Sequence, residues 1–144
     1  SDGELELPVK LKVHDSVFVP LAKWCMLLTG NYRCIEPDDM RSIRDAVHSD
    51  LELSRSVYEW VSGVCRKIGA SADDQVPFEK YAGAANGLTK PSSAARALLS
   101  GASNIERADR LVKTIAVQIG MQSDIVDATV AEVEVWLERN REKA

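Results

Sequence analysis

The chain has 144 residues, 45% of them hydrophobic, which suits one domain with a single core. Its 18 basic and 22 acidic residues give a net charge of -4, and the basic residues are scattered along the chain, which argues against nucleic acid as a partner. No stretch reaches the ~20 apolar residues of a membrane span, and the acidic start is unlike a signal peptide, so we expect a cytoplasmic protein that does not enter membranes.

The first residues carry the one strand-like pattern in the sequence. Between Leu5 and Val13, apolar and basic residues alternate with a period of two, and Pro8 restricts such a strand to a sheet edge. We therefore expect a short extended segment over residues 1–13, followed by a single helical domain over residues 14–144.

Apolar spacing and helix-end signals predict about six helices in that domain. A largely apolar helix is expected from Val17 to Leu28, ending at Gly30, and the next is expected to begin at Pro37 beside acidic residues. An apolar stripe then runs to a stop at Gly69, either in a new helix capped by Ser49 or Asp50 or in a continuation of the one from Pro37. Short helices are expected after Pro77, up to Gly87, and after Lys90 and Pro91, up to the neighbourhood of Gly101.

Two longer helices are predicted at the C-terminal end. Ser103 and Glu106 have the spacing of a capping box, and the helix that they start has Ile115 at the centre of its apolar face and a stop at Gly120. Ser123 is expected to cap the last helix. The sequence therefore predicts an all-α bundle with a short N-terminal extended segment.

Few residues have the spacing of a cofactor or metal site. The glycine patterns that hold nucleotide phosphates are absent, so we expect the chain alone to bind no dinucleotide. His14 and His48 have no second ligand one turn away, and an odd number of dispersed cysteines, at positions 25, 34 and 65, indicates buried thiols of a reducing compartment. We therefore predict no metal site.

Four residues are candidates for ligand binding, each with a structural alternative. Lys23 is the one charged residue of its apolar helix, and either extends its ammonium group to water or has a functional role. Ser92 and Ser93 follow Pro91, where their hydroxyls either cap a helix or contact a ligand. Asn31 either forms a turn or faces a cleft.

The order of these segments resembles the C-terminal helical domain of the ketopantoate reductase family, a fold also similar to the C-terminal domain of 6-phosphogluconate dehydrogenase. The resemblance rests on Trp24-Cys25-Met26-Leu27-Leu28, on the long helix ending in Lys67-Ile68-Gly69-Ala70, on Pro91-Ser92-Ser93, and on Ile105-Glu106 followed by a helix to Ile119-Gly120-Met121. Family members place an NADPH-binding Rossmann domain first, with the substrate between the two domains. The resemblance thus implies NADP as cofactor only where such a domain is supplied elsewhere.

The residues of the family's site match this sequence only in part. Met26 stands at the position of the catalytic lysine, which leaves Lys23, about one turn earlier, as a substitute. The family asparagine falls on Gly30, beside Asn31, and the substrate-binding serine falls on Ser93. The resemblance implies a substrate-binding and dimerisation domain of a 2-keto acid reductase that is not an active oxidoreductase by itself, with Asn31, Ser92 and Ser93 at the substrate.

An alternative from another class remains open, namely a non-catalytic helical module for protein interaction. For either function we expect a homodimer or a nucleotide-binding domain as partner, because a helix that is apolar on most sides needs to be covered. The Leu5 to Val13 strand and the Val17 to Leu28 helix are the expected contact elements.

Overall fold

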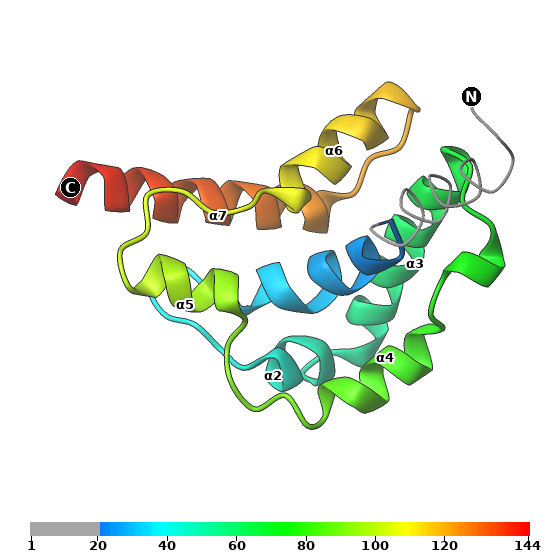
Figure 1. Cartoon of the computed structure of the whole chain (residues 1–144), viewed down its shortest axis with the longest axis horizontal. Coiled ribbons are helices and arrows are strands. Elements are labelled where there is room, and N and C mark those ends of the chain that lie inside the picture. The colour runs from blue at the N-terminus through cyan, green and yellow to red at the C-terminus, as the bar shows by residue number, and fades with distance from the viewer. Residues whose placement is uncertain (1–20) are drawn as a thin grey trace, which may run out of the picture.

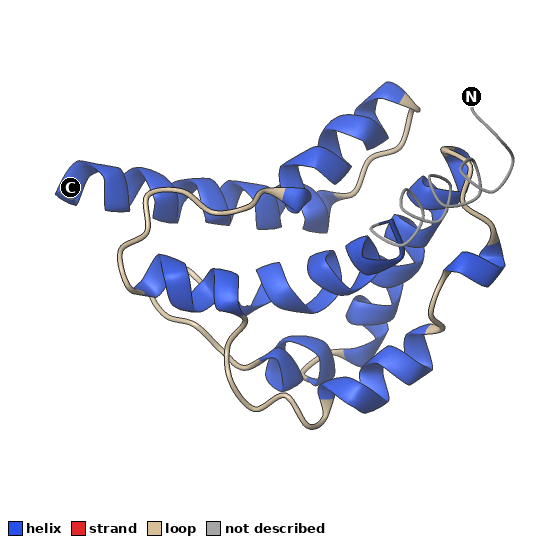
Figure 2. Ribbon diagram, viewed as in Figure 1, coloured by secondary structure: helices blue, strands red, loops and turns tan. Residues whose placement is uncertain are grey.

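A computed structural model describes residues 21–144, and all of its regular elements are helical (Figures 1 and 2). The all-α prediction is confirmed for this part of the chain. The predicted strand, His14, the boundary at residue 13 and the start of the Val17 to Leu28 helix lie outside the described residues. Within residues 21–144, no helix is both long and apolar enough to cross a membrane.

One helical segment, residues 21–34, runs through the middle of the fold and is called the central helix here (Figure 1). It is α-helical over residues 21–26, continues as a π-helical turn, η1 (Leu27–Asn31), and ends in a 3-10 turn, η2 (Tyr32–Cys34). The elements around it are α2 (Ile43–His48), α3 (Leu51–Lys67), η3 (Ala72–Asp74), α4 (Phe78–Ala85), α5 (Ser93–Leu99), α6 (Ala108–Gln118) and α7 (Asp124–Lys143).

The core is built where these helices meet the central helix. Cys25 and Leu28 of that helix are fully buried, as are Val61 of α3, Leu98 of α5 and Val112 of α6. Burial of such side chains contributes about 1.5–3 kcal/mol each, so a shared core is what holds these helices together. The described residues thus form one packed unit around one core.

The predicted end of the first helix at Gly30 is wrong. Gly30 is helical and buried, and the chain turns on to Cys34 before it becomes extended at Ile35. A methyl group on Gly30 would overlap Oη of Tyr81, which donates a hydrogen bond to the carbonyl of Met26 (3.1 Å). Glycine is therefore required at position 30 for the close approach of α4. By contrast, Gly69 and Gly120 do end α3 and α6 as predicted, with φ of 117° and 79°.

The prediction that a helix begins at Pro37 is also wrong. Residues 35–42 form a loop with an isolated antiparallel bridge between Ile35 and Met40, and α2 begins only after its N-cap, Ser42. The carbonyls that a helix would use internally are taken by α7, because Nε1 of Trp136 donates to the Glu36 carbonyl (2.7 Å) and Arg139 donates to that of Pro37 (3.2 Å). Asp50 caps α3, which settles the open question about that helix.

The capping box predicted at Ser103 does not form, and α6 begins five residues later. Its first turn is capped by a residue from another part of the chain: the Tyr32 hydroxyl accepts from the Ala108 N–H (3.0 Å) and donates to the carbonyl of Glu106 (2.5 Å). The buried residues of α6 are Asp109, Val112 and Ala116, while Ile115 is only half-buried. The predicted apolar face is therefore rotated partly towards solvent.

Candidate functional site

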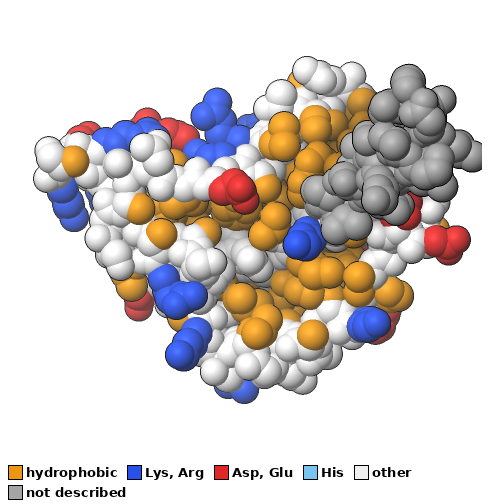
Figure 3. Space-filling model, in the orientation of Figure 1, with side chains coloured by type: hydrophobic (Ala, Val, Ile, Leu, Met, Phe, Trp, Pro, Cys, Tyr) orange, Lys and Arg blue, Asp and Glu red, His pale blue; other side chains and the backbone are white. Residues whose placement is uncertain are grey.

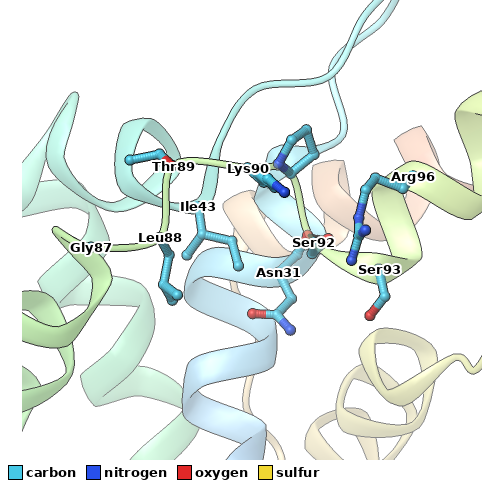
Figure 4. A pocket seen from close by; sticks show the side chains of 10 residues that line it. Asn31, Ile43, Gly87, Leu88, Thr89, Lys90, Ser92, Ser93 and Arg96 are labelled. Atoms are coloured by element: carbon cyan, nitrogen blue, oxygen red, sulfur yellow. Dashed lines mark hydrogen bonds between the residues drawn. The ribbon is translucent and has the colours of Figure 1, made fainter.

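A pocket of about 410 Å³ lies between the central helix, the start of α2 and the start of α5 (Figure 4). Its lining residues are Asn31, Ile43, Gly87, Leu88, Thr89, Lys90, Pro91, Ser92, Ser93 and Arg96. The structure thus brings together three residues predicted from the sequence as ligand contacts, Asn31, Ser92 and Ser93.

Asn31 lines this pocket from the π-helical turn of the central helix. In η1 the N–H of Tyr32 donates to the carbonyl of Leu27, the i to i+5 pattern of a π-helix, so the turn is one residue wider than in an α-helix. Asn31 is the last residue of this turn. Its side chain points into the cavity on the same side as Ser93 and Arg96 (Figure 4).

The two serines differ in their roles. Ser92 is buried, and its hydroxyl donates to the Asn31 carbonyl (2.7 Å) and accepts from the N–H of Ala95 (3.2 Å). The structural alternative for Ser92 is therefore correct, since its hydroxyl caps α5 and fixes that helix to the central helix. Ser93 is exposed at the rim of the pocket, where its hydroxyl is available to a ligand.

The walls of the pocket are held by backbone hydrogen bonds. The N–H of Ile43 donates to the Lys90 carbonyl (3.1 Å), and that of Arg44 donates to the carbonyl of Leu88 (2.9 Å). The 87–91 loop is therefore tied to the first turn of α2, and Ile43 and Leu88 form an apolar wall opposite Arg96 (Figure 4). A ligand would meet a largely preformed site.

The electrostatics of the pocket favour an anion. Lys90 and Arg96 line it, no lining residue is acidic, and neither cation forms an ion pair with a residue of the described range. The sequence analysis missed both cations as candidates. A signal was present, because a lysine precedes Pro91-Ser92-Ser93 and an arginine follows Ser93 within one helical turn.

The structure does not bring Lys23 into this pocket. Lys23 is exposed and lines a second pocket of about 520 Å³, together with Glu106 and Arg107 and with apolar groups that include Trp24, Leu27 and Leu111. Met26 packs partly buried against the core. Figure 3 shows hydrophobic side chains gathered in a band from α6 across the central helix. Leu111 of α6 is 48% exposed.

His48 and the cysteines, considered above as possible metal ligands, lie in structural positions. Nε2 of His48 lies 2.7 Å from the Ala82 carbonyl and so joins α2 to α4. All three cysteines are buried, and no cluster of three or more possible metal ligands occurs within residues 21–144.

The chain matches no protein-family model, and neither a curated protein nor a solved structure is significantly similar to it. Inference about its function therefore starts from the geometry of its own pockets.

Proposed function

We propose that this chain is the substrate-binding domain of an NADP-dependent reductase of 2-keto acids, and that the pocket at Asn31 and Ser93 holds the substrate carboxylate. One observation carries the proposal: Ser93, at the family's substrate-binding position, and Asn31, next to the position of the family asparagine, line one pocket with two cations although they lie about 60 residues apart in the sequence. An arginine and a hydroxyl are suitable donors for a carboxylate, and the NH2 of an asparagine amide can donate to the keto oxygen.

The same geometry supports a two-domain arrangement, in which this domain binds the substrate and a second domain binds the nucleotide cofactor. Within the described residues, the lysine that lines the pocket is Lys90 of the 87–91 loop, whereas Met26 occupies the position of the family lysine and Lys23 lines a different cavity. Without a bound nicotinamide, no hydride can be transferred to a carbonyl. The exposed apolar band beside the second pocket is the surface on which we expect a nucleotide-binding domain to dock.

We expect ketopantoate to bind the isolated chain with a Kd in the millimolar range, and its methyl ester to bind much more weakly because the charge is lost. Arg96→Ala should weaken binding of the acid about tenfold and leave the ester unaffected. Chemical-shift perturbation of the Asn31 side-chain amide during titration measures both affinities.

Lys67→Ala is the matched control, because Lys67 is exposed at the end of α3 and does not line the pocket. Equal binding of acid and ester, or equal losses in the two variants, would contradict the proposal. Absence of binding together with a stable dimer in sedimentation would instead favour the alternative, a helical interaction module that pairs through the apolar band.

The chain alone is expected to bind neither NADPH nor NADH, because the glycine-rich turns that hold dinucleotide phosphates are missing from the sequence. Calorimetric titration at a protein concentration of about 0.1 mM is a suitable measurement. Binding with a micromolar Kd would contradict this expectation, and with it the need for a second domain.

A further inference from the structure

The pocket at Asn31 and Ser93 contains one more cation than a single carboxylate needs. Ser93 and Arg96 are three positions apart in α5, so they are neighbours on one face of that helix. Figure 4 shows them on the same side of the cavity, where they can hold one carboxylate between them. Lys90 comes from a different element, the 87–91 loop, and its ammonium group is left over once that carboxylate is bound.

The backbone of Lys90 is held in place although its side chain is exposed. Its carbonyl accepts a hydrogen bond from the N–H of Ile43 (3.1 Å). Pro91 restricts the residue before it to extended conformations, which removes further freedom from the backbone of Lys90. Only the rotamers of the side chain then remain to be ordered by a ligand, and this lowers the entropic cost of binding.

The size and lining of the pocket indicate what a second anionic group would be attached to. Its volume of about 410 Å³ is in the lower part of the range of about 300–1,000 Å³ that is usual for small-molecule sites. The side chains of Ile43 and Leu88 form an apolar wall, against which carbon atoms can pack. These features suit a short carbon chain with an acidic group at each end.

From this arrangement we infer that the pocket takes a 2-keto acid with a second carboxylate, and that Lys90 is the residue that selects it. The inference rests on the proposed function, in which Arg96, Ser93 and Asn31 hold the first carboxylate and the keto group. The second carboxylate accepts a hydrogen bond from Nζ of Lys90, and the carbons between the two acids lie along the apolar wall. Lys90 therefore determines specificity among 2-keto acids.

The test compares three acids with the same number of carbons. 2-Oxoglutarate has two carboxylates and a keto group, 2-oxopentanoate has a methyl group in place of the second carboxylate, and glutarate lacks the keto group. We expect 2-oxoglutarate to bind the chain about fivefold more tightly than 2-oxopentanoate, the upper range for an exposed ion pair. Glutarate should also bind more weakly than 2-oxoglutarate. Chemical-shift perturbation of the Asn31 side-chain amide measures all three affinities.

Two variants separate the contributions of the two cations. Lys90→Gln should weaken binding of 2-oxoglutarate about fivefold and leave that of 2-oxopentanoate unchanged, whereas Arg96→Gln should weaken binding of both acids. Arg44→Gln is the matched control, because Arg44 is exposed beside the pocket without lining it and the same charge is lost. The bond from its backbone N–H to the Leu88 carbonyl is retained, so both affinities should stay as in the parent chain.

The outcomes distinguish this inference from the proposed function. Equal affinities for 2-oxoglutarate and 2-oxopentanoate, both reduced by Arg96→Gln, would overturn the role of Lys90 and leave the proposed function intact. Binding of glutarate as tight as that of 2-oxoglutarate, and weakened in Lys90→Gln, would support the contact with Lys90 but overturn the function in keto-acid reduction. If none of the three acids binds, both proposals are wrong.

Discussion

Replacing Arg107 by alanine is expected to lower the free energy of unfolding by about 3–5 kcal/mol, one of the largest effects of any single change in this chain. The reason is the carboxylate of Asp109, which is fully buried. Arg107 holds it with two hydrogen bonds, from Nε (2.9 Å) and from Nη2 (3.1 Å), and its Nη1 reaches Glu134 of α7 (2.9 Å). Removing the guanidinium leaves a buried charge unpaired.

Thermal unfolding of Arg107→Ala and Lys113→Ala provides the measurement. Lys113 pairs with Asp127 at 3.5 Å, with both side chains about 40% exposed, so its loss should change stability by less than about 1 kcal/mol. The double variant Arg107→Ala/Asp109→Ala should recover part of the stability lost in Arg107→Ala, because the unpaired charge is removed as well. Equal Tm values for the two single variants would contradict the expected role of Arg107.

The Arg107 contact also has a pH dependence of defined sign. The hydrogen bond from Arg107 lowers the pKa of Glu134 below its ordinary value. Because the pKa of Glu134 is lower in the folded state, its pairing with Arg107 contributes fully to stability at pH values above the ordinary glutamate pKa. This contribution is lost as the pH falls through the lowered pKa of the folded state. Glu134 is more than one-third exposed, so this contribution to stability is small.

Gly30→Ala is expected to destabilise the chain by about 2–3 kcal/mol, because the new methyl group would overlap Oη of Tyr81. Tyr81 is buried and its ring stacks on that of Tyr58 (5.6 Å between centroids), so it cannot simply turn away. Tyr81→Phe alone should cost about 1 kcal/mol through loss of the hydrogen bond to Met26.

The double variant Gly30→Ala/Tyr81→Phe decides whether this contact is the cause. It should be clearly more stable than the sum of the two single effects predicts, since removing the hydroxyl makes room for the methyl group. Gly83→Ala is the control: nothing lies within 4 Å of a methyl group there, and an exposed helical site should gain about 0.5–1 kcal/mol. Strict additivity in the double variant would show that the backbone of η1, and not the overlap, is responsible.

The sequence was sufficient for those parts of the fold that depend on neighbouring residues. The apolar stripe of α3, the stops at Gly69 and Gly120, and the caps of α5 and α7 by Ser92 and Ser123 were all predicted from short-range patterns. Such patterns act through contacts within one or two turns of a helix. They are therefore visible in a single sequence.

The predictions from the sequence are wrong where residues distant along the chain determine the local structure. Pro37 has the signals of a helix start, but α7 takes the carbonyls that the helix would need. Asp109 was not expected in the core, because only its ion pair with Arg107 makes burial of a carboxylate tolerable. In the pocket, Asn31, Ser92 and Ser93 are candidates from local helix-end patterns, and Ser93 also from the family resemblance, whereas Lys90 and Arg96 join them only because the 87–91 loop folds against α2.

The Tyr32 hydroxyl at the start of α6 has a consequence for how the chain folds. The N-terminal turn of a helix is the costly part to form, and a local cap lowers that cost before any docking takes place. In α6 the cap comes from a residue 76 positions earlier in the chain. The last two helices are therefore not an autonomous hairpin: α6 acquires its first turn only on contact with the central helix, which makes its formation and its docking a single cooperative event.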